Sequence, residues 1–129
     1  MNEEDEARRS TYFEGRELKS YAEPVSPNDL KEGMPYFTIT FADREMLVPI
    51  METLVFIGKN LQRNDVGQLY FQDVRSHRDG VRYSPGKKRQ DSQFMVYPEN
   101  NVKHVFEYER ALDVLMRCAL RCRKAGRYR

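Results

Sequence analysis

The chain has no tryptophan, only two cysteines and two histidines, and no long apolar run. A membrane-spanning helix needs about 18 consecutive apolar residues. The most apolar stretch, residues 46–61, contains charged side chains and is punctuated by Pro49 and Gly58. We therefore expect no membrane contact. The first ten residues, MNEEDEARRS, are acidic where a secretory signal peptide would be basic and then apolar, so we expect a cytoplasmic protein.

The scarce cysteines and histidines argue against a metal or redox site. Cys118 and Cys122 are four positions apart and lack the Cys-x-x-Cys spacing of zinc and redox sites. A disulfide between them is disfavoured by helical geometry and by a reducing compartment, so we interpret both as small core residues. His77 and His104 complete no structural zinc spacing with them. We expect no metal and no other cofactor.

Length and composition are those of one ordinary domain. A chain of 129 residues can bury roughly two thirds of its unfolded surface without a metal or a disulfide. The apolar fraction is 40% and the charged fraction 33%, which indicates a core inside a heavily charged shell. We divide the chain into a charged N-terminal arm, residues 1–24, and a single β-rich domain with a C-terminal helix, residues 25–129.

The net charge of +2 is unevenly distributed along the chain. Residues 1–74 contain 8 Lys/Arg and 14 Asp/Glu, a net of −6, whereas residues 75–129 contain 14 Lys/Arg and 6 Asp/Glu, a net of +8. Such a division is typical of a polyanion-binding face. It also fits an acidic segment that lies against a basic one, within one chain or between two chains.

Alternating and apolar segments predict five to six short strands. Residues 36–41 alternate between two faces, as a half-buried strand does, and residues 52–57 are apolar on both faces, as a doubly covered central strand is. Pro49 is expected at a strand edge or break. Further strands are expected at residues 68–76, 81–83, 94–97 and 102–106, with a tight hairpin turn at Asp79-Gly80.

The last predicted element is a helix over residues 107–124. Its apolar stripe is formed by Ala111, Leu112, Leu115, Cys118, Ala119 and Cys122. Val114 and Leu120 fall outside that stripe, and their exposure would indicate a second apolar contact and hence an oligomer. The order of elements predicts an α+β, β-dominated fold: an antiparallel meander or small barrel with one C-terminal helix packed on it.

A cluster of cations forms the first candidate site. Candidate nucleic-acid or partner contacts are Arg75, Arg78, Arg82, Tyr83, Lys87, Lys88 and Arg89, extended by Arg121 and Lys124 near the end of the helix. Aromatic rings among cations are typical of single-stranded nucleic-acid binding. The alternatives are contacts with a protein partner, or a solvated loop and an ordinary cationic helix end.

Asp73, Arg75 and His77 form a second candidate. On a regular strand these three side chains would share one face, where they could hold and protonate an anionic substrate, with Ser76 on the opposite face. The alternative is a polar outer face with cross-strand ion pairs. A deep pocket lined by Asp73 and His77 would favour the catalytic interpretation.

The favoured function is a non-enzymatic interaction module that binds a protein partner or another copy of itself, as a homo-oligomer. No catalytic set is assembled in the sequence, whereas Tyr and Arg, two residue types common at interfaces, are abundant. The alternative is polyanion or single-stranded nucleic-acid binding through the basic loop and helix end. A small hydrolase or transferase is the least favoured hypothesis.

Overall fold

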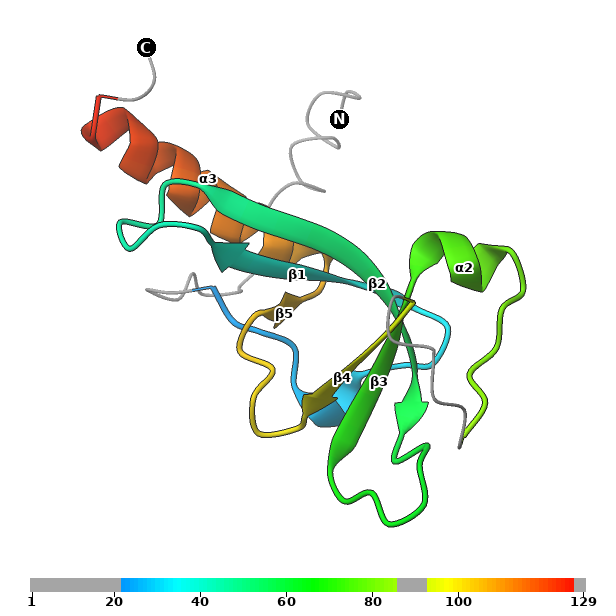
Figure 1. Cartoon of the computed structure of the whole chain (residues 1–129). Helices are drawn as coiled ribbons and strands as arrows, with labels where there is room; N and C mark the ends of the chain where they lie inside the picture. Colours follow the sequence, from blue (N-terminus) through cyan, green and yellow to red (C-terminus); the bar gives the residue numbers. More distant parts are fainter. Residues whose placement is uncertain (1–21, 86–92, 127–129) are drawn as a thin grey trace, which may run out of the picture.

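The computed structural model describes residues 22–85 and 93–126 (Figure 1). In chain order its elements are η1 (Pro27–Asp29), β1 (Pro35–Phe41), β2 (Pro49–Lys59), β3 (Gln68–Asp73), α2 (Val74–Arg78), β4 (Phe94–Pro98), β5 (Val105–Phe106) and α3 (Tyr108–Lys124). The strands form one sheet in the order β4-β3-β2-β1-β5, and every neighbouring pair is antiparallel. The predicted fold class is therefore confirmed.

Strand β1 shows how the alternating pattern produces a sheet covered on both sides. Tyr36 pairs with Leu54 across to β2, and both side chains are buried in the core on one face. Phe37 and Ile39 point to the other face, where they pack with residues of α3. The predicted alternation over residues 36–41 is confirmed, but the prediction of a half-buried strand is wrong, because each set of side chains has its own apolar cover.

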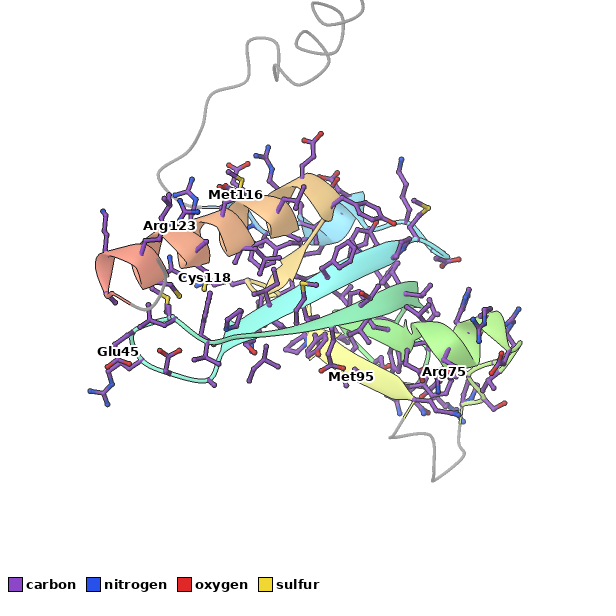
Figure 2. All side chains as sticks on the ribbon, turned by 90° about the horizontal axis from the view of Figure 1, so that it is seen from above. Glu45, Arg75, Met95, Met116, Cys118 and Arg123 are labelled. Carbon is purple, nitrogen blue, oxygen red and sulfur yellow. The ribbon has the colours of Figure 1, made fainter. Side chains whose placement is uncertain are left out.

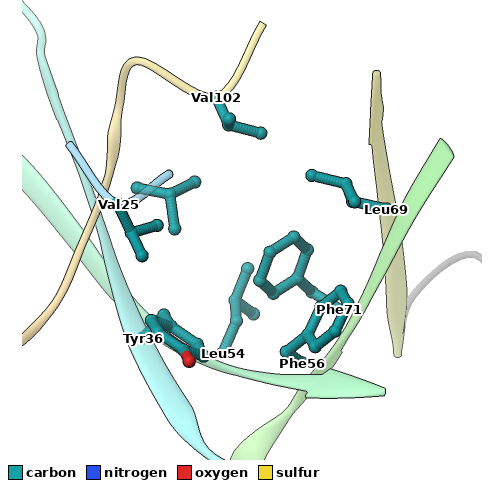
Figure 3. Packing of buried hydrophobic residues seen from close by; sticks show 8 residues of the cluster. Val25, Tyr36, Leu54, Phe56, Leu69, Phe71 and Val102 are labelled. Carbon is teal, nitrogen blue, oxygen red and sulfur yellow. The ribbon is translucent and has the colours of Figure 1, made fainter. Parts of the chain in front are cut away.

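The main core lies inside the curled sheet (Figure 3). Its buried residues are Val25, Tyr36, Leu54, Phe56, Leu69, Phe71, Val102 and Val105. Val25 and Val102 come from two segments that cover the open side, and the Val25 amide donates a 2.8 Å hydrogen bond to the carbonyl of Val105. Strands β4 and β5 are the two edges of the sheet, so within the described residues the barrel does not close by hydrogen bonds.

Helix α3 covers the opposite face beside β1 and β5 (Figure 1). Its buried residues are Ala111, Cys118 and Cys122, with Val114 and Leu115 packed beside them. The prediction of the helix is confirmed, and so is the prediction that both cysteines are buried and unpaired. The prediction that Leu112 belongs to the buried stripe is wrong, since its side chain is 61% exposed.

Strand β2 is more continuous than the sequence suggested. It starts at Pro49 and continues to Lys59, so Pro49 lies at the start of the strand, and residues 46–48 belong to the loop between β1 and β2. Leu54, Val55 and Phe56 are all buried, as predicted for a doubly covered strand. Pro49 is tolerated because it is the first residue of the strand, at the exposed end of the β1–β2 hairpin.

The segment after β3 differs most from the prediction. The strand stops at Asp73, and α2 occupies Val74–Arg78 where a continuing strand was expected. The Asp79-Gly80 pair ends this helix, and the Gly80 amide donates to the carbonyl of His77, so no hairpin forms there. Residues 81–83 are not a strand, and the last predicted strand shrinks to Val105–Phe106.

Candidate functional site

The predicted basic residues do not form one surface. Arg75 and Arg78 lie on α2 and Arg82 follows it, and all three are exposed. The last turn of α3, which contains Arg121 and Lys124, lies at the other end of the molecule (Figures 1 and 2). Arg121 and Lys124 therefore do not extend the surface that contains Arg75, Arg78 and Arg82. The remaining predicted contacts, Lys87, Lys88 and Arg89, lie outside the described residues.

Tyr83 is held by packing. Its ring lies edge-on to Tyr70, at 5.1 Å between ring centroids, and edge-on to Phe94, at 5.2 Å. Its hydroxyl accepts a hydrogen bond from the side-chain amide of Gln62. A ring with this many contacts is poorly placed to stack on a succession of bases, because such stacking needs an open aromatic face.

Arg121 attaches the β1–β2 hairpin to α3. Its Nε donates a 3.0 Å hydrogen bond to the carbonyl of Met46, and its guanidinium lies 5.3 Å from the centre of the Phe41 ring. Met46, whose carbonyl accepts this bond, has a positive φ of 59°. The contacts of Arg121 therefore stabilise the fold.

Asp73, Arg75 and His77 do not share a strand face. Asp73 is the N-cap of α2, and its Oδ1 accepts a 2.8 Å hydrogen bond from the amide of Ser76. That backbone hydrogen bond holds the pKa of the Asp73 carboxyl below its ordinary value. Asp73 and Arg75 line one hollow of about 280 Å³, whereas His77 lines a different cavity. Neither of these two cavities in the described part of the chain is lined by both Asp73 and His77, so they do not provide the pocket that the catalytic interpretation requires.

A larger cavity, which the sequence did not reveal, lies between β2 and α2. It has a volume of about 520 Å³ and is lined by Glu32, Gly33, Ile57, Leu61, Gln72, His77, Arg82, Tyr83 and Pro85. We call it the α2 cavity. Its residues come from five separate segments of the chain, so no local sequence pattern could have indicated it.

A β-bulge shapes one wall of the α2 cavity. Phe56 pairs with Phe71 and Gly58 pairs with Tyr70, which leaves Ile57 as an extra residue in β2. A bulge of this kind redirects a side chain, and here Ile57 lines the cavity. Gly58 has a φ of +149°, and a Cβ on it would come within 3.0 Å of Leu61 Cδ2. Glycine at this position therefore allows Leu61 to approach and form the same wall.

Gln72 places a free acceptor at the α2 cavity. Its side chain is only 1% exposed, and its Nε2 donates to Ser76 Oγ and to the carbonyl of Val81, both at 2.9 Å. The second bond fixes the amide orientation, because a carbonyl can only accept. No described residue donates to Gln72 Oε1. Every fully buried side-chain polar atom among the described residues has a partner, so this oxygen is not fully enclosed, and we infer that it opens on the cavity that Gln72 lines.

A third feature is an exposed apolar stripe on α3, formed by Tyr108, Leu112, Met116 and Leu120, which we call the α3 stripe. All four side chains are more than half exposed, with Met116 the most exposed at 66%. Figure 2 shows Met116 on the side of α3 away from the sheet, whereas Cys118 faces the β1–β2 hairpin. Spaced four residues apart, the side chains form one ridge along the helix.

Charged side chains are ordered along one flank of the α3 stripe. Each residue that follows a stripe residue in sequence lies on this flank, in the order Glu109, Asp113, Arg117 and Arg121. The flank is thus acidic in its N-terminal half and basic in its C-terminal half. Asp113 and Arg117 are already joined by a 2.9 Å ion pair within the helix.

Among residues 22–85 and 93–126, no group of three or more His, Cys, Asp or Glu side chains could hold a metal ion. No helix in this part of the chain is long and apolar enough to cross a bilayer. Comparisons with protein-family models, with curated proteins and with solved structures find no match to this chain.

Proposed function

We propose that the protein is a non-enzymatic interaction module that pairs with a second copy of itself through the α3 stripe. The observation that carries this proposal is the exposure of four large apolar side chains on one ridge of a single helix. Isolated exposed apolar residues are ordinary, but a contiguous set of them marks an interaction surface. Of the two residues outside the predicted stripe, Leu120 is exposed, as a second apolar contact requires, whereas Val114 packs against the core.

A second copy fits this ridge in an antiparallel arrangement. With a twofold axis between Leu112 and Met116, each of these residues meets the other on the partner helix. Tyr108 of one copy then lies opposite Leu120 of its partner, so the ridge is complementary to itself, as an isologous interface requires. Ridges of residues four apart pack at crossing angles near 50°, which would place Leu112 and Met116 at the crossing point.

The charges beside the ridge favour the same arrangement. In an antiparallel pair, the acidic half of the flank meets the basic half of the partner flank. Asp113 then lies near Arg117 of the partner, and Glu109 lies near Arg121 of the partner. In a parallel twofold pair the two charged flanks would lie on opposite sides of the interface, so these opposite charges would not meet. Because the contact is a single helix, we expect a dissociation constant in the micromolar range, on the order of 10 µM.

Sedimentation velocity over a range of protein concentrations tests the proposal. We expect a concentration-dependent dimer that persists at high salt, since its centre is apolar and salt screens only the flanking charges. Leu112→Glu with Met116→Glu should weaken the dimer at least about tenfold, because two charges would be buried without partners at the crossing point. A monomer at every concentration in both moderate and high salt would contradict the proposal.

Val66→Glu is the matched control. It also replaces an exposed apolar residue, which is 84% exposed, but lies in the loop between β2 and β3. The control should leave the dimer unchanged. Equal weakening by both sets of substitutions would mean that apolar exposure in general, and not the α3 stripe, drives the association. Circular dichroism should show the same helix content in all variants.

Single-stranded nucleic-acid binding is the alternative, and it has less support. Arg75, Arg78 and Arg82 remain exposed near α2 and could contact phosphates. Tyr83 is packed between two other rings, and the last turn of α3, which contains Arg121, lies at the other end of the molecule (Figure 1). An oligonucleotide that binds at low salt and is lost steeply as salt rises would favour this function over self-association.

A further inference from the structure

The α2 cavity has the size and composition of a small-ligand site. Its volume of about 520 Å³ lies within the range of about 300–1,000 Å³ that is typical of such sites. Apolar side chains from β2, the following loop and the segment after α2 form its walls, and a small number of polar groups converge on it. The bulge at Ile57 and the unusual φ of Gly58 are local distortions that a plain sheet would not need.

The burial of each lining residue indicates how deep in the α2 cavity its polar group lies. Gln72 is almost fully buried and presents Oε1 at the base. Leu61 and Tyr83 are half-buried and form the walls, while Glu32 and Arg82 are exposed at the rim. A matching ligand therefore needs a hydrogen-bond donor at its inner end, a flat apolar middle, and polar or charged groups at its outer end.

The charges at the rim narrow the class of ligand further. Glu32, which precedes β1, can accept hydrogen bonds from hydroxyl groups. Arg82 and His77 come from the other side of the cavity, from α2 and the segment after it, and can bind an anion. An exocyclic amine on a nucleobase can donate to Gln72 Oε1, a ribose can donate to Glu32, and a phosphate can accept from Arg82.

We propose that the α2 cavity is a binding site for a nucleoside monophosphate whose base carries an exocyclic amino group. The base lies against Ile57 and Leu61, with its amino group donating to Gln72 Oε1. The phosphate lies at the rim beside Arg82. This site is independent of the α3 stripe, which belongs to another helix, so either proposal can fail without the other.

NMR of the two histidine side chains tests the site on the full-length protein. AMP, GMP and CMP are each titrated while the imidazole resonances are recorded. His77 lines the cavity, whereas His104 lies against Tyr97 and does not, so His104 is an internal control. We expect at least one nucleotide to shift the His77 resonances saturably and to leave those of His104 unchanged. No saturable shift from any of the three would overturn the proposal.

Analogues that lack one group of the nucleotide measure the contributions of the phosphate and of the exocyclic amine separately. Adenosine lacks the phosphate, and purine riboside 5′-monophosphate lacks the exocyclic amine. Each should bind more weakly than AMP if AMP is the nucleotide that binds, and the corresponding analogues of GMP or CMP serve otherwise. Equal binding of an analogue without the amine would overturn the role of Gln72 Oε1. An equal effect of inorganic phosphate alone would reduce the site to a simple anion contact and overturn the proposal.

Two exposed arginines provide matched variants. Arg82→Ala should weaken nucleotide binding about tenfold, the usual effect of losing one charge-assisted hydrogen bond. Arg78→Ala removes the same charge from α2, but Arg78 does not line the cavity, so binding should be unchanged. Equal losses in both variants would indicate a diffuse electrostatic effect and contradict the proposed site.

Discussion

The imidazole of His104 packs edge-on against the ring of Tyr97, with 4.7 Å between ring centroids. Tyr97 belongs to β4 and His104 immediately precedes β5, the two edge strands of the sheet. This ring contact joins the two edges by packing where hydrogen bonds do not join them. It encloses one side of the main core and leaves His104 half-buried.

The His104 contact should make stability depend on pH. Burial lowers the pKa of His104 below 6.5, so the folded protein favours the neutral imidazole. As the pH falls below about 6.5, the unfolded chain takes up a proton that the folded protein resists, and the unfolding free energy should decrease. Urea unfolding at about pH 7.5 and about pH 5.5 measures this change.

Histidine variants isolate the contribution of this one side chain. His104→Gln should lose part of the pH dependence over that interval, whereas His77→Gln retains the Tyr97–His104 contact and should keep it. The same pH dependence in His104→Gln and in the wild type would show that other groups cause it.

The sequence predicted the strands and the helix best where a local pattern of apolar residues was sufficient to define the element. The alternation in residues 36–41 correctly predicted a strand, and Tyr36 and Phe37 pack in separate apolar clusters on its two faces. The predicted helix exists, but its apolar residues surround more than one face. Nothing in the periodicity could decide whether Ala111 or Leu112 would face the sheet, because that depends on how α3 lies across β1 and β5.

The candidate sites were harder to predict, for two different reasons. Asp73 is a favourable N-cap residue, and Asp79-Gly80 is a suitable end for a short helix. The sequence therefore contained features that favour α2, but the alternating pattern of residues 68–76 favoured a longer strand. The α2 cavity had no such signal. Gly58 could be recognised as the end of an apolar run, but the bulge before it depends on pairing with β3, which is a long-range property.

Gly58→Ala should destabilise the protein by roughly 1–3 kcal/mol, because its φ of +149° is almost exclusive to glycine and the new Cβ would press on Leu61 at 3.0 Å. Chemical denaturation measures the loss. Gly80→Ala is the control, since its φ is +88° but no atom lies within 4 Å of the added Cβ, and it should cost less, about 1 kcal/mol. Equal losses would mean that Leu61 can move away freely.

Asp73→Ala should lower the unfolding free energy by about 1 kcal/mol through loss of the N-cap of α2. Because the pKa of Asp73 is lowered, its contribution is present above about pH 3.8 and is lost as the pH falls further, when the carboxylate becomes protonated. Asp73→Asn keeps a capping oxygen and should be nearly neutral at pH 7. Denaturation of the two variants against Asp79→Ala, an exposed aspartate, measures the effect. A loss in Asp73→Asn as large as in Asp73→Ala would contradict a capping role.

The two cysteines should resist alkylation while the protein is folded. Cys118 and Cys122 are both 4% exposed, and their thiols contact the carbonyl of Leu47 at 3.5 and 3.4 Å. Burial also raises the pKa of Cys118, which lowers the fraction of reactive thiolate. Iodoacetamide followed by intact-mass measurement should give no adduct on the native chain and two adducts in urea.

Lys124→Cys provides the positive control for that measurement, because it places a thiol at an exposed position on the last turn of the same helix. It should be labelled once under native conditions. Fast native labelling of Cys118 would show that the hairpin and the end of α3 separate readily. The contact of Arg121 with the Met46 carbonyl would then be too weak to hold the hairpin against the helix. Arg121→Ala should increase the labelling rate if that contact does hold them together.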